Sequence, residues 1–210
     1  MNANTCSHTH NTTRQVLSKL VLFLTLALGL ASARASIISY DVNLDGPSES
    51  PPNASPGTGF GTADYDTVAH TLTLSLTFSG LLGTTTASHI HAPTTVPFAG
   101  TANIATTTPT FAGFPLGVTS GTYNTVLDLT LSSSYNSAFI TASGGTTAGA
   151  ETALMADIAA GKAYWNVHTT VVPGGEIRGF LVPVPEPTAL AFAGAGAAVW
   201  GLRAWRRRKV

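Results

Sequence analysis

The chain has 210 residues, of which 44% are hydrophobic and 10% charged, and its formal net charge is zero. This length suits one domain of ordinary size. The charge is unevenly distributed, because the segment between Ser36 and Pro183 holds nine acidic residues but only two basic ones, Lys162 and Arg178, a charge of −7. Such an acidic segment argues against nucleic-acid binding, since phosphate contacts need clustered Lys and Arg.

Residues 1–35 are predicted to form a secretory signal peptide. Positive residues come first, and an apolar run of about a dozen residues follows at 20–31, too short for the ~20 residues of a transmembrane anchor, which is the alternative. The small residues that signal peptidase accepts come next, and they are Ala33 and Ala35. Cleavage would also remove Cys6, the only cysteine of the chain, so the mature protein would have no disulfide.

Short strands separated by polar turns follow the signal peptide. The clearest alternation is at 71–78, where four apolar residues share one face and Ser or Thr the other, which is typical of a half-buried strand. Residues 46–61 are rich in Pro, Ser and Gly and are predicted to be a long surface loop. The other predicted strands are 37–44, 61–65, 87–91 and 122–131.

One helix is predicted over 151–160, because its residues are mostly strong helix formers, Glu151 falls in the first turn and Gly161 follows the last. Many short strands and a single helix indicate an all-β fold. We expect an antiparallel β-sandwich or barrel of the Ig-like or Greek-key type, with one short helix.

Residues 162–181 are predicted to form a β-hairpin. Residues 172–175, Val-Pro-Gly-Gly, supply the turn, and Pro at the second position with Gly at the third is typical of a type II turn. The hairpin holds three of the few titratable side chains of the segment, His168, Glu176 and Arg178.

The C-terminal residues are predicted to form a second sorting segment. An apolar run at 188–202 would span ~23 Å as a helix, rather short for the ~30 Å core of a bilayer without help from its flanks. A basic tail follows, and the positive-inside rule predicts that it stays in the cytoplasm while the domain lies outside. Its basic residues are Arg203, Arg206, Arg207, Arg208 and Lys209.

The sequence over 184–210 contains Pro185-Glu186-Pro187, then the apolar run, then the basic tail. This order resembles the PEP-CTERM sorting signal of Gram-negative bacteria. The resemblance implies cleavage by a membrane exosortase, with the helix as a transient inner-membrane anchor and the domain then placed at the cell surface or released. It also implies an organism that makes exopolysaccharide and biofilm matrix. A plain tail anchor is the alternative.

The predicted domain, 36–183, resembles a CHRD domain, the module named after chordin, from residue 38 onwards. The family is expected to be all-β and extracellular, and it has no agreed biochemical activity. One departure from the family is Ala92-Pro93, where its members usually have Gly, so the next loop is expected to take another path. The segments that carry the resemblance are 44–52 (LDGPSESPP), 87–91 (ASHIH), 163–169 (AYWNVHT) and 173–179 (PGGEIRG).

His89 and His91 are two residues apart on a predicted strand, so both rings project from the same face, and His168 of the hairpin can join them. Three neutral imidazoles suit Zn or Cu, with a carboxylate or water as fourth ligand. The alternative is structural: these histidines would hydrogen-bond to backbone or to Glu49 and Glu176 and fix loops against the sheet.

No catalytic constellation is evident, so the protein is not expected to be an enzyme: a Gly-x-Ser-x-Gly elbow, a P-loop and a nucleophile–base pair are all missing from the sequence. Glu176 and Arg178 are interpreted as a structural ion pair or as separate surface charges. The first hypothesis is a structural or interaction module at the cell surface or in the matrix, without a cofactor. Signal peptidase and exosortase would process it, and exopolysaccharide or surface proteins would be its partners.

Two other functions stay open. One is an extracellular Cu or Zn protein that uses the three histidines. The other is glycan adhesion, in which Tyr164, Trp165 and the acidic residues would bind sugars or calcium.

Overall fold

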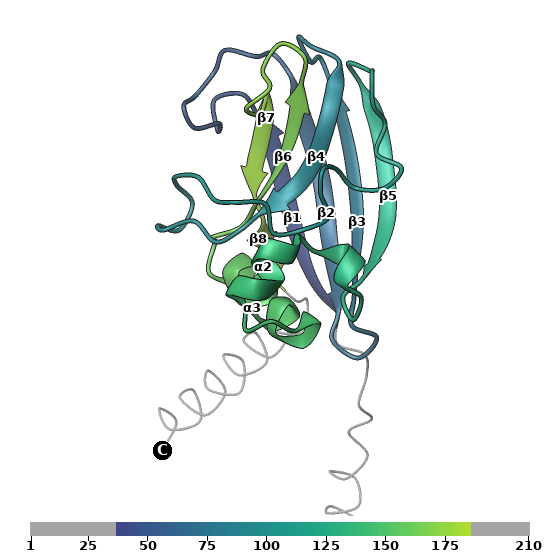
Figure 1. Ribbon diagram of the computed structural model, residues 1–210. Coiled ribbons are helices and arrows are strands. Elements are labelled where there is room, and N and C mark those ends of the chain that lie inside the picture. Colours follow the sequence, from purple (N-terminus) through teal and green to yellow (C-terminus); the bar gives the residue numbers. More distant parts are fainter. Residues whose placement is uncertain (1–36, 186–210) are drawn as a thin grey trace, which may run out of the picture. The chain divides into compact units, whose positions relative to one another are not determined.

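The computed structural model describes residues 37–185, which form one antiparallel, eight-stranded sheet that curls into a half-barrel (Figure 1). This confirms the expected all-β fold of the sandwich or barrel type. The predicted signal peptide, the apolar helix and basic tail, and the sorting motif from Glu186 onwards lie outside the described residues. The strands are β1 Ile37–Asp45, β2 Thr58–Asp66, β3 Thr71–Ser79, β4 Thr85–His91, β5 Gly121–Asp128, β6 Tyr164–Thr169, β7 Ile177–Phe180 and β8 Val182–Pro183.

The strands follow the order β4-β6-β7-β1-β2-β3-β5 across the sheet, and β8 is an additional partner of β1. β1, β2 and β3 pair in sequence order, whereas the β6–β7 hairpin is inserted between β4 and β1. β7 joins β1 through the single ladder pair Asp45–Arg178. The topology therefore brings the predicted histidine strand β4 directly against the predicted hairpin.

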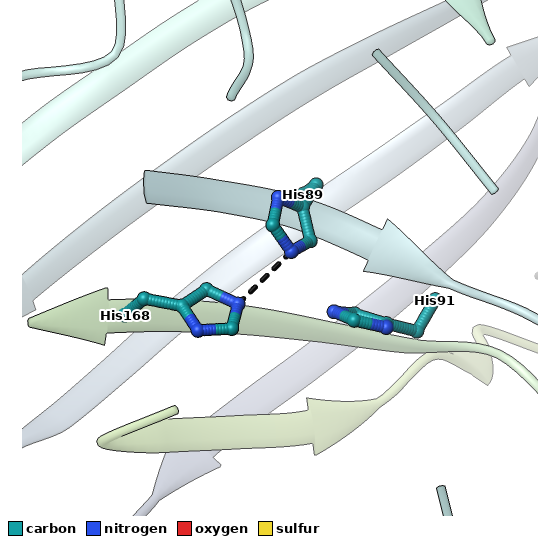
Figure 2. Close-up of side chains that lie close together, drawn as sticks. All are labelled: His89, His91 and His168. Carbon is teal, nitrogen blue, oxygen red and sulfur yellow. Dashed lines mark hydrogen bonds between the residues drawn. The ribbon is translucent and has the colours of Figure 1, made fainter. Parts of the chain in front are cut away.

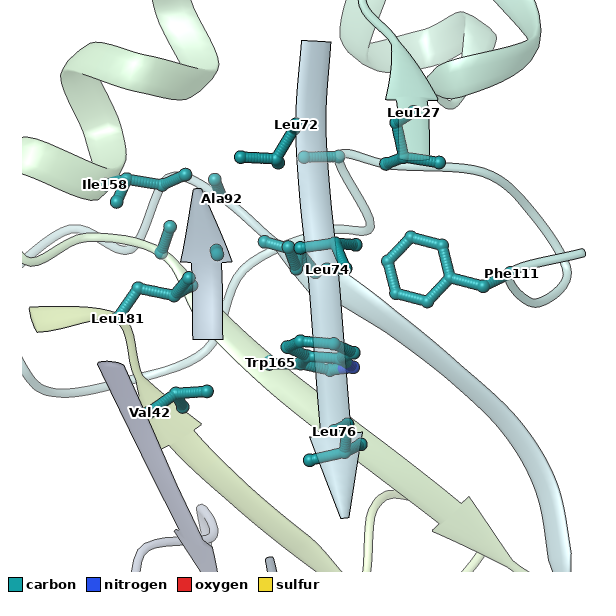
Figure 3. Close-up of a cluster of buried hydrophobic side chains, with 14 of the residues drawn as sticks. Val42, Leu72, Leu74, Leu76, Ala92, Phe111, Leu127, Ile158, Trp165 and Leu181 are labelled. Atoms are coloured by element: carbon teal, nitrogen blue, oxygen red, sulfur yellow. The ribbon is translucent and has the colours of Figure 1, made fainter. Parts of the chain in front are cut away.

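The core fills the inner face of the curled sheet (Figure 3). The alternating residues of β3 are buried as the sequence predicted, and they are Leu72, Leu74, Leu76 and Phe78. Trp165 of β6 is fully buried among them, and its indole Nε1 donates to Ser88 Oγ at 2.8 Å. The described residues, 37–185, contain an eight-stranded sheet and a continuous core, which is what a domain needs to fold by itself.

The two ends of the strand order, β4 and β5, are bridged by the connection 92–120. Its backbone bonds along the free edge of β4: Phe111 N donates to Ser88 O at 3.0 Å and Gly117 N to Thr85 O at 2.9 Å. These bonds satisfy an edge that would otherwise be exposed. The long connection is therefore part of the barrel wall.

The helical content differs from the single helix predicted. The predicted helix is α3, Thr147–Ala159, which begins four residues earlier than expected. Two further elements were not predicted from the sequence, namely α2, Ser137–Ala142, and the 3-10 turn Ser132–Ser134. The side chains of Asn136 and Thr146 cap α2 and α3, which is the signal that was missed. Gly161 follows α3 at φ +67°, in agreement with the prediction that Gly ends the helix. None of the helices between residues 37 and 185 has the length and apolar character needed to cross a bilayer.

Three local predictions need correction. The loop predicted over 46–61 is shorter, because β2 already begins at Thr58, and it is not simply a surface loop, since Glu49 and Ser55 are buried. β5 ends at Asp128 and not at 131. The hairpin turn is closed as predicted, because Gly175 N donates to Val172 O at 3.0 Å. It is not a type II turn, however, since the positive φ belongs to Gly175, at +129°, and not to Gly174.

A candidate metal centre on the outer face of the sheet

The three predicted histidines lie close together (Figure 2), and alternation along the strands places them on the outer face of the sheet, opposite the core. On β4 the core residue Ile90 points inward, so His89 and His91 point outward, as alternation along a strand requires. On β6 the core residues Trp165 and Val167 point inward, so His168 points outward beside them. The ladder pairs His168 with Ala87, which places its ring diagonally next to His89.

The imidazole nitrogens of the cluster are close together. His89 Nε2 and His168 Nε2 are 2.9 Å apart, and one ligand nitrogen from each of the three rings lies within 4.8 Å of the others. The ring centroids of His89 are 4.6 Å from His91 and 4.7 Å from His168. His89 and His91 are 3% and 9% exposed, whereas His168 is half-buried, so the outer-face site is open on the side of His168.

Each ring of the cluster has its Nδ1 bonded to a backbone carbonyl. His89 Nδ1 faces Pro109 O at 3.2 Å, and His91 Nδ1 faces Ala102 O at 2.8 Å. The third bond, His168 Nδ1 to Pro173 O, is also 2.8 Å. A carbonyl oxygen only accepts, so the proton of each neutral ring is assigned to Nδ1, and Nε2 keeps its lone pair.

The 2.9 Å contact between His89 Nε2 and His168 Nε2, drawn as a hydrogen bond in Figure 2, needs a proton on one of the two nitrogens, and with both Nδ1 atoms protonated neither neutral ring has one there. His91 Nε2 is fully buried and has no hydrogen-bond partner among the described residues. Burial first, and the neighbouring imidazoles second, lower the pKa of His89 to about 3. Burial also lowers the pKa of His91 to about 4 and that of His168 below its usual value, so protonation does not relieve the contact at neutral pH.

This donor set fits a first-row transition metal. Zn and Cu bind neutral imidazole nitrogen at about 2.0–2.1 Å, so two nitrogens on one ion lie about 3.3 Å apart, close to the spacing of His89 and His168. In metal sites the second ring nitrogen usually donates to a carbonyl or carboxylate, which fixes the tautomer and the ring orientation. All three rings already have this arrangement.

A buried polar network adjoins the cluster on the same face. Asn166, which pairs with His89 across the ladder, donates from Nδ2 to Glu49 Oε1 at 2.9 Å, and its Oδ1 is the second buried polar atom without a partner in the described part of the chain. Glu49 Oε2 is 3.8 Å from Arg178 Nε. Burial raises the pKa of Glu49 to about 7, although the guanidinium of Arg178 opposes this.

Glu49 and Glu176 do not bond to the histidines, so this part of the structural alternative is wrong. Glu176 is fully buried and does not pair with Arg178 either. Its carboxylate accepts from Ser55 Oγ and Thr169 Oγ1 at 2.6 Å, and from the backbone N–H groups of residues 82 and 83. Glu176 thus joins three loops at the end of the hairpin, and neither it nor Arg178 is a surface charge.

The two aromatic residues predicted to bind sugars are not exposed. Trp165 is 0% and Tyr164 3% exposed, so neither offers a platform for a glycan. Tyr164 lies flat against His91, with centroids 4.8 Å apart and planes 5° apart, and it is a neighbour of the cluster that the sequence did not identify. His70, which had no predicted role, bonds through Nδ1 to Glu151 at 2.8 Å, far from the three histidines in the strand order.

A groove of about 800 Å³ reaches the cluster from the side of the helices. It lies between the connection 92–120 and helices α2 and α3, and His91 is one of its lining residues, with Ile104, Phe139 and Asp157. The groove thus borders the His91 ring, although Nε2 of that ring is buried.

Two family models match the chain. The model of the CHRD domain matches residues 40–181, and the model of the PEP-CTERM protein-sorting motif matches residues 183–209. No curated protein and no solved structure matches the chain.

Proposed function

The chain belongs to the CHRD domain family, and we propose that it is an exported surface protein whose domain binds a transition-metal ion, Zn or Cu, through His89, His91 and His168. The PEP-CTERM motif at its end indicates export and sorting. The CHRD family is not a known enzyme family, so the proposal is a binding function and not a catalytic one.

One observation carries the metal proposal: one nitrogen from each of the three rings lies within 4.8 Å of the others while each Nδ1 is bonded to a carbonyl, an arrangement that leaves the lone pair of each neutral ring on Nε2. A structural histidine usually uses both ring nitrogens or leaves one in water. Here His91 Nε2 is buried without a partner, which costs free energy unless something fills the site. An ion bound by all three rings would satisfy these lone pairs together.

The export pathway of the proposal has two steps. Signal peptidase would cleave after Ala35, and a membrane exosortase would then recognise Pro185-Glu186-Pro187. The apolar run at 188–202 would hold the precursor in the inner membrane of a Gram-negative bacterium until that cleavage. In the extracellular space the protein has access to metal ions, and its site contains no thiol that could be oxidised.

The test is a calorimetric titration of residues 36–185 with Cu(II) and with Zn(II). We expect one ion per domain, and we expect His89→Ala and His168→Ala to weaken the affinity by more than the 10–100-fold that loss of an outer partner costs. His70→Asn is the matched control, because it alters a histidine outside the cluster and Asn tolerates the positive φ of that position.

Equal heats in the wild type, the two cluster variants and the control would refute the metal proposal. The histidines would then only tie loops to the sheet through their Nδ1 bonds. In that case the first hypothesis from the sequence, a structural or interaction module of the cell surface or matrix, would be the better description.

A further inference from the structure

Arg178 is a buried cation next to the histidine cluster. It lies on the outer face of β7, opposite Asn166 of β6, and is 4% exposed. A guanidinium out of water must have its N–H groups bonded and its charge compensated. The groups bonded to the Arg178 guanidinium therefore show which segments of the chain this side chain holds in place.

Its partners belong to two different connections of the sheet. Nε donates to the carbonyl of Ser48, in the loop between β1 and β2, and Nη1 donates to Gly100 O at 2.9 Å, in the connection 92–120. The carboxylate of Glu49 is 3.8 Å from Nε. One side chain thus fixes both loops to the sheet.

Two short routes lead from Arg178 to His91. The guanidinium carbon lies 4.6 Å from the centroid of the Tyr164 ring, and Tyr164 stacks in parallel on His91. Because β6 lies between β7 and β4 in the sheet, Tyr164 separates Arg178 from His91. A cation over an aromatic face is favourable, so this stack restrains the plane of the His91 ring.

The second route runs through the backbone. Gly100, held by Arg178, is two residues before Ala102, whose carbonyl accepts the Nδ1 proton of His91 at 2.8 Å. The N–H of Ala102 donates to Tyr164 Oη at 3.3 Å. Arg178 therefore contacts both groups that orient His91, the ring on its face and the loop that carries its hydrogen-bond acceptor.

We propose that Arg178 is the positioning residue of the metal site: it holds His91 with Nδ1 protonated and Nε2 directed at the ion. This inference rests on the proposed function for its metal consequence, but the orientation of His91 is a property of the metal-free domain as well. Arg178 does not touch the ion; it acts through Tyr164 and Ala102.

The experiment compares Arg178→Met with Glu176→Gln in residues 36–185. Met keeps the apolar stem but donates to neither loop. Glu176→Gln perturbs a buried polar network of similar size that is bonded to Ser55 and Thr169 and not to the histidines. Two quantities are measured, the tautomer of His91 by ¹⁵N NMR of the metal-free domain and the affinity for Zn(II).

We expect Arg178→Met to convert His91 to a mixture of tautomers and to weaken Zn(II) binding by 10–100-fold, the usual effect of losing an outer partner. Glu176→Gln should lower the melting temperature yet keep the His91 tautomer and the affinity. If Arg178→Met does not fold, Arg178→Lys replaces it: Lys keeps the charge but lacks the planar fork that spans both carbonyls, so the same shift is expected at smaller size.

A wild-type tautomer of His91 in the Arg178 variant would overturn the inference, and so would an equal loss of the tautomer in Glu176→Gln. The failure of the proposed function has a different signature. In that case the wild-type domain takes up no Zn(II), whereas the NMR comparison in the metal-free domain still decides the role of Arg178.

Discussion

The buried histidines and Glu49 respond to pH in opposite directions. The pKa of His89 is lowered to about 3 and that of His91 to about 4, so below pH ~6.5 the unfolded chain binds protons that the folded domain does not. The pKa of Glu49 is raised to about 7, so between pH ~4.5 and 7 the folded domain holds a proton that the unfolded chain lacks. The histidines destabilise the domain as pH falls, and Glu49 partly compensates.

We therefore predict that the metal-free domain loses stability from pH 6.5 to pH 4.5. Each proton bound only by the unfolded chain lowers the free energy of unfolding by about 1.4 kcal/mol per pH unit, and at least two histidines outweigh one carboxyl. The urea midpoint measured across this range should fall as pH falls. Glu49→Gln removes the compensation, so its midpoint should fall more steeply; a flat profile in the wild type would contradict the assignment of neutral, buried histidines.

The contact between β7 and β1 depends on the absence of a side chain at Gly179. A Cβ at this position would lie 1.9 Å from the carbonyl oxygen of Asn43, a backbone atom that cannot move aside without shifting β1. The hairpin that holds His168 and Arg178 is joined to the N-terminal half of the sheet at this point. The close approach of two strand backbones is thus a condition for joining the hairpin to β1.

For Gly179→Ala we predict a loss of at least about 2–3 kcal/mol in the free energy of unfolding, because the methyl group overpacks against backbone. Urea unfolding of residues 36–185 measures it. Gly174→Ala is the control, since a Cβ there meets no atom within 4 Å and its φ is not positive, and a change within about 0.5 kcal/mol is expected. Equal stability of the two variants would mean that the strands separate more easily than this packing implies.

The sorting motif begins where the folded domain ends, with almost no linker between them. Val184 N still donates to Ser39 O at 2.8 Å, and the matched sorting motif begins at residue 183, within β8. An exosortase that takes an extended segment at Pro185 therefore approaches the folded domain closely.

In the native host we predict that Glu186→Ala makes the full-length precursor accumulate in the membrane fraction, since recognition of the motif would be lost. Immunoblots of membrane, surface and medium fractions measure this. His89→Ala is the control: it alters the domain and not the sorting segment, so it should be processed as the wild type is. Normal processing of Glu186→Ala would show that the exosortase does not recognise the acidic residue of the motif.

The family, the sorting motif and most strand positions could be predicted from the sequence, because alternation along a strand and turn residues are local properties. The position of His89 and His91 on the same face of one strand followed from the same alternation. The helix α2 could not be predicted in this way, since it has only six residues, four of them the weak helix formers Ser, Phe, Ile and Thr, and its cap at Asn136 is a single side chain.

The sequence by itself determined that an acidic β-domain of the CHRD family is followed by a PEP-CTERM sorting motif, and that two histidines share one face of a strand; the signal peptide at 1–35 stays a prediction. Only the tertiary structure decided that His168 joins them, that carbonyls from the connection 92–120 and from the hairpin turn fix all three tautomers, and that Arg178, Glu49 and Tyr164 are buried beside them. The physical reason is that strand order and loop closure depend on contacts between residues far apart in the chain. Local preferences of the residues leave those contacts open.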